Sequence, residues 1–319
     1  MAAGRHALVV SIDLDEWFHS RRWIDGEQTH AVPDTRALFQ RLYGADRPAG
    51  EIIAPTRALL DLFDRHGVSI TFFVLGEVAE WYPDLVREIA ARGHEIGCHG
   101  QHHVDMTVLG PEIFGAQLDR AIAVIDSLTG KRPVGYRAPN LVYEPWATRV
   151  LESRGFVYDS TVCVSRPIGG KYQGWTHAPH HPYHPSYDAI GARGDARLVE
   201  LPLPSFPVIR LSAGSGILTR VLGLHWTMTS LRYRIRSGDT GFYFHPWEVA
   251  PPSPAATGGG FRQQLFYRRA GPWMLGAVER ILEQFEGRTV TAGQAARAFL
   301  AADPPAPKPL NLGQVEKPQ

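Results

Sequence analysis

Two histidines spaced four residues apart, His99 and His103, form the most informative pair of chemically active residues in this sequence. On a helical turn, residues at this spacing lie on one face about 6 Å apart, so both imidazoles could bind one divalent metal. The spacing alone is weak evidence, because the chain contains 14 histidines. A hydrolytic metal site commonly adds a carboxylate as its third protein ligand. The candidates are Asp13 and Asp15, at the end of the first apolar segment.

The elements that would position these residues are short buried strands separated by helices. Apolar segments predict strands at 7–12, 68–75, 94–98, 135–139, 156–160, 198–203 and 241–245. Helical patterns occupy 53–66, 77–92, 111–128, 144–154, 217–235 and 261–285. This alternation predicts an α/β fold, a distorted (β/α) barrel of about seven parallel strands. Such barrels carry their sites at the carboxyl ends of the strands, where the sequence has Asp13, Asp15, His99, Arg137, Asp159 and His245.

Three other segments interrupt the alternation. Residues 17–52 show no clear period and predict an irregular insertion with one short helix. Residues 163–197 form a long loop with a histidine run at 177–184, but the prolines between these histidines argue for a structural role over a second metal site. We expect residues 1–302 to form one domain, closed by a helix with a Thr291–Gln294 capping box. The proline-rich residues 303–319 predict a disordered tail.

Composition excludes several classes of function. A net charge of +1 gives no reason to expect nucleic acid or an anionic membrane as partner. Two cysteines exclude a disulfide framework. The first apolar segment is shorter than that of a signal peptide and is followed directly by a charged residue, Asp13. No segment approaches the roughly 18 apolar residues of a membrane span. We therefore expect a cytoplasmic protein without membrane insertion that acts on small or weakly charged substrates.

Five short motifs together resemble those of the polysaccharide deacetylase family, carbohydrate esterase family four. The resemblance spans residues 7–250 and is specific because the motifs occur in order, each at the end of a predicted strand. They are Asp13-x-Asp15, His99-x-x-x-His103, Arg137-Ala138-Pro139, Tyr158-Asp159-Ser160 and Phe244-His245-Pro246-Trp247-Glu248. The resemblance implies a distorted (β/α) barrel, one divalent metal held by an Asp and two His, and hydrolysis of an N-acyl group from an amino sugar.

The motif residues suit the chemistry of that reaction. Asp15, His99 and His103 would hold the metal, which lowers the pKa of its bound water. Zinc is the expected ion, although cobalt, nickel or iron suits the same ligands. Asp13 would act as general base and His245 as general acid for the departing amine. Taken singly, Asp13 and Asp15 could equally be solvated carboxylates at the end of a strand, and His245 could be a histidine of the core.

The remaining motif residues have supporting roles in this scheme. We expect Arg137 to hold the pKa of Asp13 low, and Asp159 to hydrogen-bond His245 and raise its pKa. The backbone N–H of Asn140 would stabilise the oxyanion. Glu16 competes with Asp15 as metal ligand, but the alternation of a strand places Asp15 on the face of Asp13 and Glu16 opposite.

Substrate contacts are expected from aromatic side chains and from the last motif. Trp247 and Glu248 would pack against or orient the site, and Glu248 could touch substrate. The loop of residues 163–197 carries Tyr172, Trp175 and Tyr183, whose flat faces could stack on a sugar ring if the loop overhangs the same barrel mouth. The duller alternative is that these aromatics anchor the loop to the barrel.

Three departures from the family's usual motifs indicate a divergent branch. Gly100 replaces a Ser or Thr, Asn140 replaces an aromatic residue, and the fourth motif lacks its Trp. The chain thus resembles deacetylases associated with surface-polysaccharide or glycoconjugate biosynthesis, with a small, nucleotide-linked or lipid-linked amino sugar as substrate. The main alternative is an amidohydrolase of ureides or cyclic imides on the same fold. A catalytically inactive carbohydrate-binding barrel is disfavoured, because the base, the acid and three ligands are all present.

Overall fold

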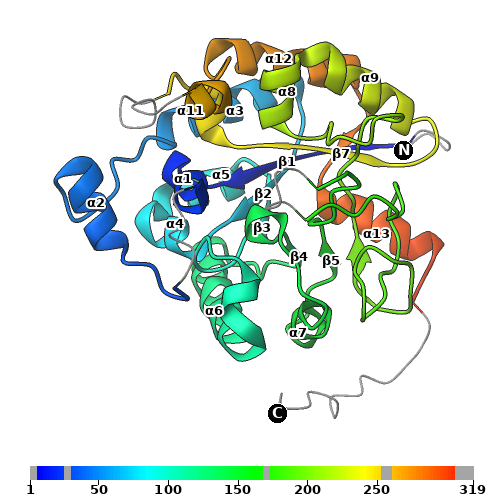
Figure 1. Ribbon diagram of the computed structural model, residues 1–319, viewed down its shortest axis with the longest axis horizontal. Coiled ribbons are helices and arrows are strands. Elements are labelled where there is room, and N and C mark those ends of the chain that lie inside the picture. Colours follow the sequence, from blue (N-terminus) through cyan, green and yellow to red (C-terminus); the bar gives the residue numbers. More distant parts are fainter. Residues whose placement is uncertain (1–5, 25–29, 168–172, 253–260, 306–319) are drawn as a thin grey trace.

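A curved parallel sheet forms the centre of the protein in the computed structural model, which describes residues 6–24, 30–167, 173–252 and 261–305 (Figure 1). Its strands lie in the order β6-β5-β4-β3-β2-β1-β7, and every pair is parallel. This arrangement confirms the predicted α/β barrel of about seven parallel strands. The strands are β1 (Leu8–Leu14), β2 (Thr71–Val74), β3 (Glu95–Cys98), β4 (Gly135–Tyr136), β5 (Tyr158–Asp159), β6 (Val199–Glu200) and β7 (Thr240–Phe244).

The central strand β1 separates the outer core from the inside of the barrel. Its alternate residues Leu8, Val10, Ile12 and Leu14 are buried in the main hydrophobic core. Because successive side chains of a strand point to opposite faces, Ser11 and Asp13 face inward. A short strand that the sequence pattern did not predict, β8 (Thr289–Val290), pairs with the first residues of β1.

Helices cover both outer flanks of the sheet. In Figure 1, α3, α8, α9 and α12 lie above β1, whereas α4, α5, α6 and α7 lie below it. The amphipathic patterns that predict these helices bury their apolar faces in the main core. Their bounds are α3 (Ile53–His66), α4 (Gly76–Trp81), α5 (Pro83–Ala91), α6 (Met106–Thr129), α7 (Ala147–Ser153), α8 (Gly216–Leu222), α9 (Leu224–Arg234), α11 (Phe261–Phe266), α12 (Pro272–Gln284) and α13 (Ala292–Ala302).

Three predicted helices are each divided in two. The helix predicted over 77–92 breaks between α4 and α5 at Pro83, which has no N–H to donate to the preceding turn. The one over 217–235 breaks at Gly223, and the one over 261–285 breaks before Gly271; both glycines have positive φ. In each case the sequence pattern predicted one helix where the structure has two.

The segment after β1 is more regular than predicted. It holds two helices, α1 (Trp17–Ile24) and α2 (Thr35–Tyr43), where one short helix was expected. Asp34 caps α2 by accepting a hydrogen bond from the Ala37 N–H at 2.9 Å. Figure 1 shows α1 beside the carboxyl end of β1, whereas α2 projects from the body of the protein. The insertion therefore reaches the end of the sheet where the motif residues gather.

The loop of residues 163–197 does not lie as predicted. Its histidine run reaches the amino end of β7, where His181 contacts the carbonyl oxygen of Asp239 at 3.1 Å. Tyr183 is fully buried, and its hydroxyl donates a hydrogen bond to the Ile190 carbonyl at 2.6 Å. This part of the loop anchors to the barrel at the end opposite His245, so the expected overhang at the barrel mouth is wrong for it. Tyr172 and the predicted tail beyond residue 305 lie outside the described residues.

None of the helices in the described ranges has both the length and the apolar character needed to cross a membrane.

Candidate active site

One carboxylate and two imidazoles converge at the carboxyl ends of β1 and β3. Asp15, His99 and His103 are buried, and each offers one ligand atom within 4.8 Å of the other two. The His103 Nε2 atom lies 3.5 Å from Asp15 Oδ2. These are the three residues predicted to hold the metal, and a divalent ion could bind between them.

The two histidines converge through a bent loop, not through the helical turn that their spacing suggested. Residues 99–105 lie outside the helices and strands of this region, and Gly100 has a φ of 92°. This positive φ is strained for any residue with a side chain, which explains why Gly replaces the Ser or Thr expected at this position. The hydrogen bond of His99 Nδ1 to the Arg137 carbonyl, at 2.8 Å, fixes the ring so that Nε2 faces the cluster.

The charge state of the cluster suits a cation. Burial raises the pKa of Asp15 to about 7, an effect that the charge of His245 only partly offsets. Burial also lowers the pKa of His99 to about 4, so this imidazole is neutral and free to coordinate. Asp15 Oδ2 is buried and accepts no hydrogen bond within the described part of the chain. A buried acceptor in this state is costly, and a bound cation would satisfy it.

Glu16 points away from this cluster. Its Oε1 atom accepts a hydrogen bond from the Tyr82 hydroxyl at 2.6 Å, and burial raises its pKa to about 8. Glu16 is absent from the group of converging ligand atoms. The strand alternation that favoured Asp15 over Glu16 therefore agrees with the observed geometry.

A second carboxylate, Asp13, is paired with a buried arginine. Arg137 donates a hydrogen bond to Asp13 Oδ1 at 2.7 Å, and both side chains are almost fully buried. Burial opposes ionisation of Asp13, but the charge and the hydrogen bond of Arg137 help to outweigh it, so the pKa of Asp13 falls below its ordinary value. Ser11 and Ser160 hold the guanidinium in place at 3.0 and 2.9 Å. Asp13 is therefore an ionised carboxylate beside the metal ligands, as a general base must be.

The histidine of the last motif faces the same cleft but has an unexpected partner. His245 Nδ1 lies 2.8 Å from Glu248 Oε1, and Arg220 donates to the other oxygen of Glu248 at 2.6 Å. Burial alone would lower the pKa of His245, but Asp15 and Glu248 raise it to about 9. The imidazole is thus protonated at neutral pH, as a general acid requires.

The expected hydrogen bond from Asp159 to His245 is therefore corrected. Asp159 accepts hydrogen bonds from the backbone and the hydroxyl of Thr161, at 3.1 and 2.8 Å. Burial raises its pKa and that of the neighbouring Glu200. Asp159 thus holds the turn whose Ser160 carbonyl accepts from Arg137 at 2.8 Å. Asp159 therefore contacts the segment that holds Arg137, whereas His245 has Glu248 as its partner.

The predicted substrate residues divide into two groups. Asn140 lines the cleft between the histidines, with φ at 55° and its side-chain amide donating to Asp105 at 2.6 Å. Trp247 and Glu248 are buried behind His245, where they orient it; Trp247 also donates to Asp15 Oδ1 at 3.2 Å. Trp175 packs against the main core and Gly191, and it is not among the residues that line the cleft.

The cleft has further walls that sequence reasoning missed. Together with Asp13, His99, His103, Asn140 and His245, its lining residues are Ser20, Leu141, Ile217 and Tyr243. Tyr243 could have been found, since strand alternation places it on the face of His245. Leu141 could not, because nothing local announces its φ of 54°, a value rare for leucine.

A hydrogen-bonded group behind His103 was also missed. Glu77 bonds to His19 Nε2 at 3.1 Å and to His102 Nδ1 at 2.8 Å. The His19 ring stacks on His103 with ring centroids 5.4 Å apart. His102 therefore lies outside the ligand cluster and contacts it through Glu77. Glu77 lies on α4, and nothing in the surrounding sequence identifies it as part of the site.

Comparison with known families agrees with this geometry. Residues 53–158 match the family model of polysaccharide deacetylases, which includes His99, His103 and Arg137. Residues 53–158 are therefore similar in sequence to polysaccharide deacetylases. Residues 163–292 match a domain of unknown function, DUF3473, which contains His245. The sheet joins the two matched segments, since β2 to β5 belong to the first and β6 to β8 to the second.

The relatives of this chain are similar over part of their length. The peptidoglycan deacetylase-like protein FGM2 of Gibberella zeae is 40% identical over 106 residues, 33% of this chain and 31% of that protein. The peptidoglycan deacetylase of Helicobacter pylori is 32% identical over 142 residues, 44% of this chain and 45% of that protein. The chain thus matches a third to a half of these relatives.

Solved structures share the fold. A protein of Mycobacterium smegmatis described as a polysaccharide deacetylase superposes with a TM-score of 0.65 at 21% identity, over 100% of this chain and 97% of that one.

Proposed function

We propose that this protein is a metal-dependent hydrolase that removes an N-acetyl or other small N-acyl group from an amino sugar. The observation that carries the proposal is that Asp15, His99 and His103 converge within 4.8 Å beside an ionised Asp13 and a protonated His245. A ligand set, a base and an acid around one cleft are the groups that amide hydrolysis requires. The deacetylase names of the relatives support the same reaction class.

The protein's own residues account for the proton transfers. When bound by Asp15, His99 and His103, a divalent ion such as zinc would supply Lewis acidity toward water and a carbonyl oxygen. Asp13, held ionised by Arg137, accepts the proton of the attacking water. His245, held protonated by Glu248, donates a proton to the amine nitrogen as the C–N bond breaks. Since the two groups lie on neighbouring strands β1 and β7, they can act on one substrate from different sides.

The backbone after Pro139 is suited to the developing negative charge. Asn140 and Leu141 both have positive φ, a sparsely populated conformation that persists only where the surroundings enforce it. We assign the backbone N–H of Asn140 to the oxyanion, because this residue lines the same cleft as His99 and His245. Leu141, Ile217 and Tyr243 provide apolar walls for the acyl group and the sugar ring.

The proposed substrate is a small or carrier-linked acetamido sugar, in keeping with the divergent motifs. The test is acetate release by the zinc-loaded protein from N-acetylglucosamine, UDP-N-acetylglucosamine, a lipid-linked N-acetyl sugar and peptidoglycan. Release from one of the first three, above that from peptidoglycan, supports the proposal. Activity only on a parallel panel of ureides and cyclic imides would assign the site to the alternative reaction, and no activity on either panel would overturn an enzymatic role.

A further inference from the structure

A second cavity, with several basic side chains in its lining, lies at the opposite end of the barrel from the candidate active site. It has a volume of about 570 Å³, within the range of roughly 300–1,000 Å³ typical of small-molecule sites. Its lining includes Arg193, Arg234 and Arg236. It lies before β7, whereas His245 follows that strand, so the two sites are separated by the strand's five residues, about 17 Å.

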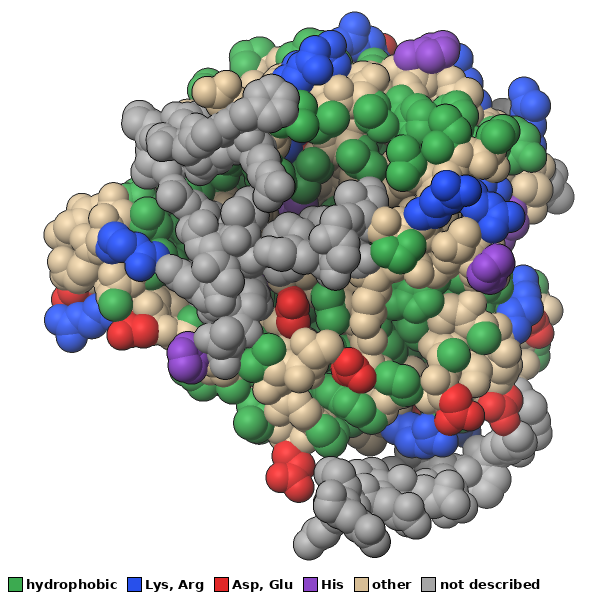
Figure 2. Space-filling view, viewed as in Figure 1, with side chains coloured by type: hydrophobic (Ala, Val, Ile, Leu, Met, Phe, Trp, Pro, Cys, Tyr) green, Lys and Arg blue, Asp and Glu red, His purple; other side chains and the backbone are tan. Residues whose placement is uncertain are grey.

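The charged side chains of this cavity are all basic. Among the described residues, three arginines and the histidines His177, His180 and His181 line it, and no carboxylate does. This concentration contrasts with a net charge of only +1 for the chain. In Figure 2, Lys, Arg and His side chains gather at the right of the view, the side on which α9 ends in Figure 1. A cavity of one sign concentrates ligands of the opposite sign.

Arg234 is the most informative residue of this cavity. Its side chain is 8% exposed, and its Nε donates to the Ser205 carbonyl at 3.2 Å. It makes no ion pair within the described part of the chain, although buried charges are almost always paired. Its guanidinium lies 5.4 Å from the centroid of the Tyr233 ring, and because Arg234 lines the cavity, an anion bound there would supply a counter-ion.

The cavity wall beside Arg234 is fixed. Both ring nitrogens of His181 are engaged, Nδ1 with the Asp239 carbonyl at 3.1 Å and Nε2 with the Ser237 hydroxyl at 2.9 Å. Gly238 permits this close approach, since a Cβ at that position would lie 2.4 Å from the His181 ring. His180 differs, because its Nδ1 atom is buried and makes no hydrogen bond to any described residue. Because His180 also lines the cavity, a ligand bound there would lie beside its ring.

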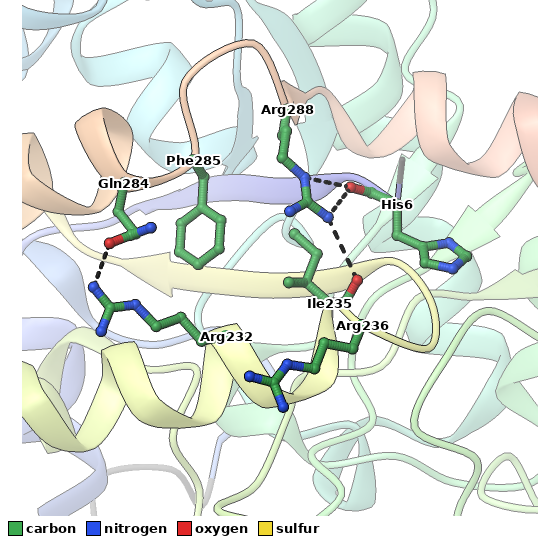
Figure 3. A pocket seen from close by; sticks show the side chains of 7 residues that line it. All are labelled: His6, Arg232, Ile235, Arg236, Gln284, Phe285 and Arg288. Atoms are coloured by element: carbon green, nitrogen blue, oxygen red, sulfur yellow. Dashed lines mark hydrogen bonds between the residues drawn. The ribbon is translucent and has the colours of Figure 1, made fainter. Parts of the chain in front are cut away.

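The arginines of an adjacent cavity differ from Arg234, because their side chains are hydrogen-bonded to distant parts of the chain. Figure 3 shows Arg288 bonded to the carbonyls of His6 and Ile235, at 2.7 to 3.4 Å, and Arg232 bonded to Gln284. Through these hydrogen bonds the two guanidinium groups connect segments that are distant in the sequence. Arg236 lines both cavities, and its side chain makes no hydrogen bond or ion pair to a described residue. The free donors thus belong to the cavity of Arg234.

We propose that the cavity formed by Arg193, Arg234, Arg236 and His180 binds a phosphorylated small molecule through its phosphate group. Guanidinium groups match the oxygens of a phosphate in geometry and charge, and the volume admits a sugar phosphate beside the basic residues. The proposal does not depend on the reaction at the other end of the barrel. It adds a ligand site that the deacetylase chemistry does not use.

Binding is tested by calorimetry of the full chain with inorganic phosphate and glucose 6-phosphate at low ionic strength. Arg193→Gln and Arg236→Gln remove exposed charges without disturbing the core, and each is expected to weaken binding about 10-fold, the usual loss of a charge-assisted hydrogen bond. Arg232→Gln is the matched control, because it removes the same charge from the same region but from an arginine already bonded to Gln284.

A second readout follows His180 by NMR. Burial and the charge of Arg234 lower its pKa to about 4, and a phosphate bound beside the ring should raise that value. Saturable binding that is lost in Arg193→Gln and Arg236→Gln and kept in Arg232→Gln, with an upward shift at His180, supports the site. No binding of either probe, an equal loss in Arg232→Gln, or binding only to vesicles containing phosphatidic acid would overturn it.

Discussion

His102 and His103 are neighbours in sequence, but their side chains have different partners in the structure. His103 points to Asp15, whereas His102 bonds to Glu77. Replacing His103 or His99 by Ala should therefore remove bound metal and activity together, because two remaining ligands hold a divalent ion poorly. His102→Ala is the control and should retain metal. Elemental analysis of the three purified variants decides between them, and full metal occupancy in His103→Ala would contradict the ligand assignment.

Asp13 and Asp15 can likewise be distinguished by their different partners, Arg137 for Asp13 and the two histidines for Asp15. Asp13→Asn should keep the metal and lower kcat by about 10² to 10⁴, the contribution of general acid–base catalysis. Asp15→Asn should weaken metal binding itself, since Asp15 belongs to the ligand cluster. Glu16→Gln, which changes a neighbouring buried carboxyl group bonded to Tyr82, is the control for a carboxyl-to-amide substitution outside the ligand cluster. Metal content and kcat measured on the same preparations would reveal an exchanged base and ligand as the reverse pattern.

Glu248 determines the alkaline limit of the proposed reaction. The pKa of His245 is raised to about 9, so the rate should fall as the pH rises through that pKa and the acid loses its proton. A bound cation beside Asp15 offsets part of this effect and moves the limb below 9. Glu248→Gln should move it lower still, by about 1 to 3 pH units, because it removes the adjacent negative charge. A kcat/KM profile whose alkaline limb is identical in the two proteins would contradict this role.

At the scale of elements, the sheet depends on close contacts that only glycine permits. A Cβ on Gly135 of β4 would lie 1.9 Å from the Tyr158 ring on β5. Gly135→Ala should therefore destabilise the fold by about 1 to 3 kcal/mol, through overpacking. Gly276→Ala in α12 is the control and should stabilise by up to about 1 kcal/mol, since its nearest neighbour is a flexible arginine end at 3.8 Å. Urea unfolding measures both, and a neutral Gly135→Ala would show that β4 and β5 can move apart.

The loop of residues 163–197, where the structure describes it, makes the contacts of a scaffold. Trp175 packs against the main core and Gly191, outside the cleft lining. Trp175→Ala should therefore lower the free energy of unfolding by about 2 to 4 kcal/mol through lost burial, while kcat/KM and metal content stay unchanged. The opposite result, a normal melting temperature with a raised KM, would restore Trp175 to the substrate site.

At the scale of the whole molecule, the sequence predicts features that repeat along the chain, such as apolar strands, and features that depend only on neighbouring residues. Strand ends such as Asp13 and His245 were found because apolar strands and their polar termini are visible in the pattern, and parallel strands bring those termini to one edge. The partner of His245 was assigned wrongly to Asp159, because a position at a strand end does not tell how far away that strand lies in the barrel. Arg220 and Glu77 were missed for a related reason: their partners come from distant elements that meet only in the folded chain.

Metal binding should stabilise the whole protein, because Asp15 follows β1 while His99 and His103 follow β3, two strands apart in the sheet order. An ion that binds only the folded state adds RT ln(1 + [M]/Kd), about 4 kcal/mol at 1,000 times Kd. Asp15 must lose its proton to bind, and burial raises its pKa to about 7, so affinity should increase as the pH rises toward 7 and then level off. The measurement is the melting temperature of chelator-treated protein with and without zinc between pH 5 and 8. His102→Ala should keep the zinc-dependent rise in melting temperature and His103→Ala should lose it; an equal rise in both would place the ion somewhere other than beside Asp15.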